Sequence, residues 1–346
     1  MCYKTENKFM KNGIFFVICS FLNLPLLFAQ LSEPKDNLEN VKVFNIYLHK
    51  VYDVEMKKGA VTFFKKEKII AHSLFEYDKN GNELLRNYYQ SSTDKIQESY
   101  VYEYDSTNRM TQELYILQGK ILGGKTIYSY DKQGRKAQAT VYSSKDEVKN
   151  TVKFEYDSMG NLIAEKTYNT IFLAIKNIQY KYDERNNQIE KRNIKTPYLK
   201  NNNAYQEIQS FDDSNRLISK THYDDKESLT WKYTAKYDAK NKLIEEQTVN
   251  GTGKTISYAI YTYNKKGLMA SSYNFDISQK VPPMRIEYKY DKKGLNNLRY
   301  IYVQDATTPT ITKRYYYDDK GNWYLWYEIN HDDNTQAIAN RKIVYF

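Results

Sequence analysis

Histidine is the side chain best suited to metal binding or proton transfer at neutral pH, and the chain has four of them. His49, His72, His222 and His331 lie far apart, and no two have the spacing of a metal-ligand pair or a catalytic dyad. The sequence also lacks G-x-S-x-G and H-E-x-x-H, and we expect no phosphate-cradling glycine loop. We therefore expect isolated surface histidines, and we assign no catalytic, cofactor-binding or metal-ligating residue.

Carboxylates are abundant, with 42 Asp and Glu residues, and one set of aspartates recurs at a regular interval. If each interval holds two strands, successive members of this set stand about 10 Å apart. Calcium needs several oxygens at about 2.3–2.6 Å, so we interpret the recurring aspartates as turn caps. A glycosidase-type carboxylate pair stays open as an alternative, because the sequence singles out no pair.

Aromatic side chains are the remaining candidates for ligand contact, since flat rings in a row can stack on sugars or other extended ligands. The alternative is that the rings form cross-strand ladders and bury one another. Two of the three tryptophans lie within six residues, and a period of two predicts one on each face of a strand. The candidate ligand-binding aromatics are Tyr102, Tyr128, Tyr180, Tyr261, Tyr288, Trp323 and Trp326.

These residues belong to ten copies of one short pattern, in which an aromatic precedes Asp or Asn and Gly or Asn follows four residues after the aromatic. Fixed periods of this size indicate repeat architectures. The period is 26 or 27 residues except for one interval of 29. The pairs are Tyr77-Asp78, Tyr104-Asp105, Tyr130-Asp131, Tyr156-Asp157, Tyr182-Asp183, Phe211-Asp212, Tyr237-Asp238, Tyr263-Asn264, Tyr290-Asp291 and Tyr317-Asp318.

Each copy predicts a β-hairpin. Residues before the aspartate alternate, as in Tyr100-Val-Tyr102-Glu-Tyr104, which is typical of a strand with one packed face. Asp caps a type I turn, and Gly or Asn tolerates the positive φ that closes it. A second set of Gly and Pro residues predicts a return turn, giving two strands per repeat. The predicted structural turns include Asp78, Gly81, Asp131, Gly134, Asp157, Gly160, Asp238, Asn241, Asp291, Gly294, Asp318 and Gly321.

About twenty strands exceed what a flat open sheet tolerates. We therefore predict an all-β fold in which tandem β-hairpins form one long curved or spiralling antiparallel sheet. The alternative is a five-bladed, propeller-like array with two repeats per blade. The repeats occupy residues 71–346 together with a C-terminal capping strand. Residues 30–70 are expected to be an N-terminal linker and a degenerate capping repeat.

The segment FEYDSMGNLI at Phe154–Ile163 resembles the YD repeats of Rhs-type proteins, and the similarity spans roughly residues 75–330. The resemblance implies β-hairpins joined edge to edge in a spiralling sheet, which encloses a toxin domain in large members of the family. This chain departs from that pattern, because the repeat region is far shorter than an enclosing shell and no toxin-like domain follows it.

The first 29 residues resemble a secretory signal peptide. Lys4, Lys8 and Lys11 precede an apolar stretch, and Leu27-Phe28-Ala29 is a suitable cleavage site. Both cysteines, Cys2 and Cys19, lie in this leader, so disulfides are not expected in the mature chain. No later segment has the length of an apolar transmembrane helix. These features predict a secreted protein, or one of the periplasm or outer envelope of a bacterium.

The functional hypothesis is a non-enzymatic binding or structural module without a cofactor. Its expected partner is carbohydrate, on which rows of aromatic rings could stack, or an anionic surface polymer, which would require the cations of successive repeats to align. The lysines and arginines are scattered rather than clustered, so no nucleic acid is expected. The alternatives are an envelope polysaccharide hydrolase and an accessory or remnant of an Rhs-like toxin-delivery system. The sequence does not indicate an oligomeric state.

Overall fold

The computed structural model describes residues 34, 36–37, 40–57, 60–90, 95–197 and 204–346, and these residues form 22 strands in one sheet. The strands are β1 (Val41–Lys57), β2 (Ala60–Tyr77), β3 (Glu83–Tyr89), β4 (Ile96–Tyr104), β5 (Met110–Leu117), β6 (Ile121–Tyr130), β7 (Lys136–Ser143), β8 (Val148–Tyr156), β9 (Leu162–Asn169), β10 (Ala174–Tyr182), β11 (Gln188–Ile194), β12 (Tyr205–Phe211), β13 (Leu217–Tyr223), β14 (Leu229–Tyr237), β15 (Leu243–Asn250), β16 (Thr255–Tyr263), β17 (Met269–Asp276), β18 (Val281–Tyr290), β19 (Asn296–Val303), β20 (Ile311–Tyr317), β21 (Trp323–Asn330) and β22 (Gln336–Tyr345). The prediction of an all-β chain is confirmed.

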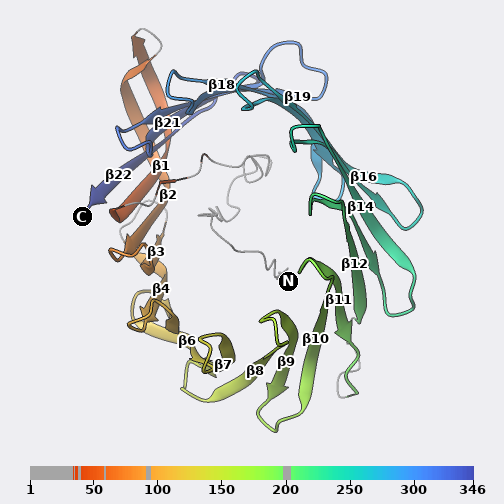
Figure 1. The fold of residues 1–346 in the computed structure, drawn as a ribbon. Coiled ribbons are helices and arrows are strands. Elements are labelled where there is room, and N and C mark those ends of the chain that lie inside the picture. Colours follow the sequence, from red (N-terminus) through yellow and green to blue (C-terminus); the bar gives the residue numbers. More distant parts are fainter. Residues whose placement is uncertain (1–33, 35, 38–39, 58–59, 91–94, 198–203) are drawn as a thin grey trace.

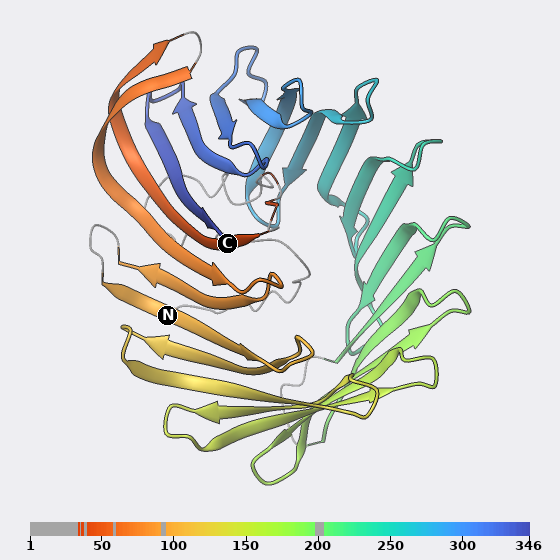
Figure 2. The same cartoon turned by 60° about the vertical axis from the view of Figure 1, so that its left-hand side comes forward.

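Each strand pairs antiparallel with the strands before and after it in the sequence, so the sheet is a continuous meander. The ten repeat turns all lie at one end of the strands, here called the Asp-turn rim. The connections after the odd-numbered strands from β3 onward lie at the opposite end, here called the return-turn rim. Figures 1 and 2 show the hairpins arranged side by side around a ring.

The sheet closes on itself, and this finding corrects the predicted architecture. β1 pairs with β2 on one side and with β22 on the other, with Ile46 opposite Arg341 and Leu48 opposite Ala339 (Figure 1). The result is a closed 22-stranded antiparallel barrel, so the spiralling sheet, the edge-to-edge Rhs-type arrangement and the propeller are all wrong. The segments expected to cap the two ends of an array instead pair with each other. Closure satisfies the backbone groups that two open edges would have exposed.

The register fixes the size of the barrel and identifies its inner face. If paired residues are followed from strand to strand once around the barrel, the path returns to β1 at a position about 22 residues further along that strand. This offset is the shear of the barrel, and for 22 strands it implies a strand tilt of about 35° and a barrel diameter of about 40 Å. Barrel strands wind in the right-handed sense that sheet twist imposes. With this register, that winding turns the side chains of Tyr102, Tyr104 and their equivalents inward. We call this face the inner wall.

Among the described residues, the largest cluster of buried hydrophobic side chains lies at the seam where the barrel closes. Phe44, Phe75, Trp323 and Ala339 are among the buried residues of one cluster that joins β1, β2, β21 and β22. Arg341 lies within the cluster, and its guanidinium is 3.6 Å from the Trp323 ring centroid. The two chain ends are thus held together by side-chain packing as well as by the backbone ladder.

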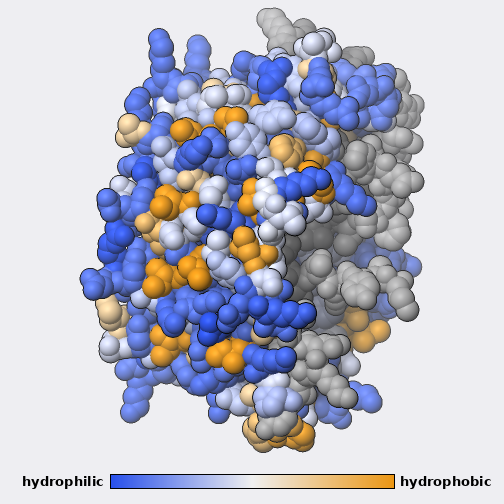
Figure 3. Space-filling view, turned by 90° about the vertical axis from the view of Figure 1, so that its right-hand side faces the viewer, coloured by the Kyte–Doolittle hydropathy of each residue, from blue (hydrophilic) through white to orange (hydrophobic). Residues whose placement is uncertain are grey.

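The outer face seen in Figure 3 is mostly hydrophilic, with apolar side chains in separate patches among charged ones. Outward side chains of β14 and β16 show the same mixture. Lys236 on β14 and Thr262 on β16 are polar, whereas Ile260 on β16 is apolar and 39% exposed. Among the described residues, no helix is long and apolar enough to cross a membrane.

Candidate functional site

The Asp-turn rim is built from one repeated hydrogen-bonding unit. In the second repeat, Asp105 Oδ1 accepts hydrogen bonds from the backbone amides of Thr107 (2.9 Å) and Arg109 (3.0 Å). Asp105 Oδ2 accepts a hydrogen bond from Arg109 Nε at 2.8 Å, and the Arg109 side chain holds the pKa of this carboxyl well below its usual range. Asn108 closes the turn with a φ of 62°.

The same turn recurs in all ten repeats, where the Asp or Asn amide bonds the carbonyl four residues later and its own carbonyl accepts the amide three residues later. The structure therefore places the recurring aspartates in turns, where their carboxylates face backbone amides. The closing residues with positive φ are Gly81, Asn108, Gly134, Gly160, Asn186, Asn215, Asn241, Gly267, Gly294 and Gly321.

The aromatic of the motif links neighbouring repeats. Tyr130 donates a hydrogen bond from its hydroxyl to the Met110 carbonyl at 2.6 Å, and the Arg109 guanidinium lies 4.7 Å from the Tyr130 ring centroid. In eight of the ten repeats such a bond ties the hairpin to the preceding one beyond the backbone ladder, at about 0.5–1.5 kcal/mol per hydrogen bond. Equivalent bonds to the preceding repeat are made by Tyr104, Tyr156, Tyr182, Tyr237, Tyr263, Tyr290 and Tyr317.

The five tyrosines predicted to bind a ligand lie two residues before these linking tyrosines, half-buried on the inner wall. Tyr128, Tyr180 and Tyr261 donate their hydroxyls to glutamates of the preceding strand, at 3.3, 2.8 and 2.5 Å. Burial, and then the neighbouring glutamate, raises the pKa of each of these hydroxyls. The Tyr288 hydroxyl lies 3.2 Å from Ser272 Oγ, and Tyr102 packs near the Arg86 guanidinium.

Across β12 to β14 the inner wall carries a stack of aromatic rings that the sequence did not reveal. His222 lies between Tyr205 and Trp231, at centroid distances of 5.2 and 5.3 Å and interplanar angles of 20° and 17°. His222 Nδ1 is 2.6 Å from Thr230 Oγ1, and burial lowers the pKa of this imidazole. Only knowledge of which residues share the inward face of three strands could have grouped these rings.

Charged groups lie beside this stack. Lys220 Nζ is 2.9 Å from a Glu207 carboxylate oxygen, with side-chain exposures of 19% and 13%, and 5.6 Å from the Trp231 ring. Glu246 accepts hydrogen bonds from Tyr233 at 2.8 Å and from Tyr261. We call this group the inner sector, comprising Tyr205, Glu207, Lys220, His222, Trp231, Tyr233, Glu246 and Tyr261.

The paired tryptophans are buried rather than exposed on a sheet face. Trp323 is 2% exposed and Trp326 is 9% exposed, and both belong to the seam cluster. The prediction of one tryptophan on each face is wrong, because the register shifts between Tyr316 and Tyr317. This β-bulge inserts one residue and returns both indoles to the inner wall.

The expectation of four surface histidines also needs correction. His49 and His72 are buried, and His72 lies between Tyr47 and Tyr89 with centroid distances of 4.1 and 3.9 Å. Only His331 is exposed, with Nε2 2.9 Å from Thr312 Oγ1. Within the described part of the chain, no group of three or more His, Cys, Asp or Glu residues is placed to hold a metal ion.

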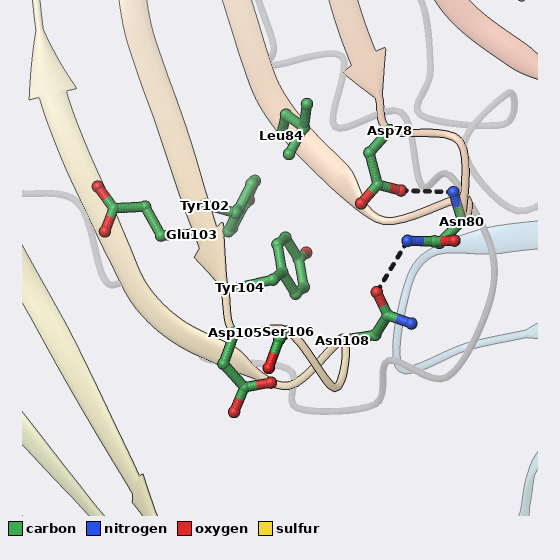
Figure 4. Close-up of a pocket in the computed structure, with 9 residues that line it drawn as sticks. All are labelled: Asp78, Asn80, Leu84, Tyr102, Glu103, Tyr104, Asp105, Ser106 and Asn108. Carbon is green, nitrogen blue, oxygen red and sulfur yellow. Dashed lines mark hydrogen bonds between the residues drawn. The ribbon is translucent and has the colours of Figure 1, made fainter.

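Two open depressions occur at equivalent places on the Asp-turn rim, with volumes of about 510 and 220 Å³. The larger lies between the turns of Asp78 and Asp105 and is lined by Tyr102 and Tyr104 (Figure 4). Two side-chain amides that line it bond each other, since Asn80 Nδ2 donates a hydrogen bond to Asn108 Oδ1 at 2.9 Å. The smaller depression has the same relation to the turns of Asp291 and Asp318. These depressions are spaces between adjacent repeats.

Comparisons with known proteins give no family assignment: no family model matches the chain, and no curated protein matches it. Among solved structures, a TcdB2–TccC3–Cdc42 crystal structure is 16% identical over 81% of this chain and 16% of that one, with a TM-score of 0.39. The Tc holotoxin pore of Photorhabdus luminescens is 14% identical over 77% and 17% of the two chains, with a TM-score of 0.30. A porin-like protein from Bacteroides uniformis is 9% identical over 88% and 98%, with a TM-score of 0.31. The chain spans about one sixth of the toxin chains.

Proposed function

We propose that this protein is a non-enzymatic carbohydrate-binding barrel of the bacterial envelope or exterior, with its ligand contacts in the inner sector. The export assignment is supported by the pattern of residues 1–29, which lie outside the described residues. A closed barrel is compatible with such a location, because it exposes no unpaired sheet edge.

The observation that carries the proposal is the chemistry of the inner wall. A barrel about 40 Å across is too wide for its own side chains to fill, as in other large barrels. The wall nevertheless carries ordered aromatic rings, together with glutamates held by tyrosine hydroxyls and by Lys220. Rings beside fixed donors and acceptors are what a sugar requires, since its faces are apolar and its edges carry hydroxyls.

The polysaccharide hydrolase alternative receives no support from the carboxyl groups. A glycosidase needs a general acid whose pKa is raised. Among the described residues, every carboxyl with a resolved shift has its pKa lowered, as for Asp183 by the Asn187 side chain and for Asp212 by Arg216. The hydrogen bonds that lower these values serve the turns and strand pairings.

The test is binding of residues 30–346 to an array of bacterial and plant polysaccharides, followed by calorimetry on each polysaccharide retained. Trp231→Ala removes an indole from the inner sector and is expected to weaken binding about tenfold or more. The matched control is Ile208→Thr, which changes an outward side chain on β12 that is 38% exposed. Circular dichroism verifies that both variants fold.

Retention of no carbohydrate by the folded wild-type chain would refute the proposal. Equal affinity of wild-type protein and Trp231→Ala would place the site elsewhere on the barrel and refute the assignment to the inner sector. Release of reducing ends during incubation would favour the hydrolase alternative.

A further inference from the structure

The return turn between β9 and β10 carries two apolar side chains in solvent. Ile171 is 69% exposed and Phe172 is 81% exposed, which makes Phe172 the most exposed large apolar residue among those described. Exposed apolar residues scattered singly on a surface are ordinary, but two at the tip of one projecting turn are a local concentration.

The backbone of this turn presents these side chains at a conformational cost. Phe172 has a φ of 58°, a region that bulky residues rarely occupy. The turn is otherwise built like those of the Asp-turn rim, with Asn169 Oδ1 accepting the amides of Ile171 (3.1 Å) and Leu173 (2.9 Å). At the position of Phe172, the ten equivalent turns of the Asp-turn rim carry only Gly or Asn. In the return turns of the same build the equivalent residues are Asp146, Glu227 and Gly253, so a bulky apolar residue at this position is particular to Phe172.

Neighbouring return turns extend the apolar tip. Ile121 begins β6 and is 55% exposed, and Val148 begins β8 and is 40% exposed. Hairpins in this sector succeed one another at about 10 Å, so the four side chains span about 20 Å along the rim. We call Ile121, Val148, Ile171 and Phe172 the apolar arc.

The charges around the apolar arc are unlike those on the rest of the rim. Five exposed lysines flank it and two exposed acids, Asp146 and Glu147, oppose them. Both counts cover each described return turn and the first three residues of the strand that follows it. From β13 to β22 the balance reverses, with five exposed acids against three exposed lysines. The flanking lysines are Lys120, Lys145, Lys149, Lys176 and Lys195.

We propose that this sector of the return-turn rim docks on the surface of an anionic lipid bilayer, with Ile171 and Phe172 inserted at the boundary between headgroups and acyl chains. Apolar side chains on a projecting turn, surrounded by lysines, match that boundary because the apolar side chains enter the acyl layer while the ammonium groups meet the lipid charges. The two contributions act together, and neither alone gives stable attachment. The barrel would then stand with its Asp-turn rim facing away from the membrane.

The test is co-sedimentation of residues 30–346 with vesicles of phosphatidylcholine alone and with vesicles that contain one quarter phosphatidylglycerol. The second vesicles are expected to bind the protein, and binding is expected to weaken as salt is raised. The double variant Ile171→Thr/Phe172→Asn is expected to lower the apparent affinity about tenfold or more. Asn suits the backbone conformation of position 172, so this variant retains its turn.

The matched control is Met159→Ser. Met159 is 68% exposed and lies in the Asp157 turn on the opposite rim, so its loss is expected to leave vesicle binding unchanged. The proposal is overturned if the wild-type protein does not sediment with anionic vesicles, if the double variant binds them as well as wild type, or if Met159→Ser reduces binding equally. The carbohydrate assay does not depend on this rim, so the two proposals fail independently.

Discussion

Replacing Arg341 by methionine tests whether the seam determines the stability of the barrel. The Arg341 side chain is 1% exposed, lies 4.4 and 3.6 Å from the Phe44 and Trp323 ring centroids, and bonds Asp36 Oδ1 at 2.6 Å. Methionine keeps most of the packing volume but leaves the 11% exposed Asp36 carboxylate without this cation. Breaking a buried ion pair from one side costs about 3–5 kcal/mol, a large part of the 5–15 kcal/mol typical of folded domains.

The assay is urea unfolding of Arg341→Met, Asp36→Asn and the double variant. Arg341→Met is expected to lose about 3–5 kcal/mol, and the double variant is expected to lose less than the sum of the single variants, because both members of the pair are then neutral. A loss below about 1 kcal/mol for Arg341→Met, or strictly additive losses, would show that the pair does not hold the seam. The control is Arg192→Met, because the Arg192 side chain is half exposed and its ion pair with Glu190 is expected to contribute little to stability.

Further expectations concern the turns, the ionisable groups and the core. Gly134→Val places a β-branched residue at a φ of 78° and is expected to cost about 1–2 kcal/mol in urea unfolding, whereas Gly134→Asn is expected to be nearly neutral. Because the folded pKa of Asp105 lies below its ordinary value of 3.8, its contribution to stability is present above pH 4 and lost as pH falls, so the melting temperature of Asp105→Asn is expected to converge on that of wild type in acid. Because burial raises the pKa of Tyr104 and Tyr345 to about 12, stability is expected to be retained up to pH 10 and to decline toward pH 12, which ultraviolet titration of the phenolates can follow. Trp323→Ala is expected to cost about 3–5 kcal/mol, with retention of wild-type stability as the contrary result.

The local structure of this chain was predictable because its turn chemistry is explicit in the sequence. Asp and a Gly or Asn three residues later indicate where the chain reverses, and Asp131 and Gly134 are placed in such a turn. Alternation identified the face of β4 that carries Tyr102 and Tyr104. These inferences need only neighbours along the chain.

Closure was not predictable in the same way, because it depends on the accumulated twist and register of 22 strands. No local pattern states that β1 will lie beside β22, and the terminal segments were interpreted as caps because they depart from the repeat. Apart from Tyr261, the residues of the inner sector were missed for the same reason, since Tyr205, His222 and Trp231 meet only across three strands. One bulge, after Tyr316, was enough to reverse the predicted placement of a tryptophan.

The pairing of the first strand with the last has a consequence for the order of assembly. Consecutive hairpins need only short-range contacts, but the amide of Phe346 bonds the carbonyl of Asn40 at 2.9 Å across nearly the whole polypeptide. This contact cannot form on the ribosome until β22 has been synthesised, so a nascent chain that lacks β22 exposes two long unpaired strand edges to other molecules. Pairing of β22 with β1 thus converts an open, aggregation-prone sheet into a barrel without unpaired edges.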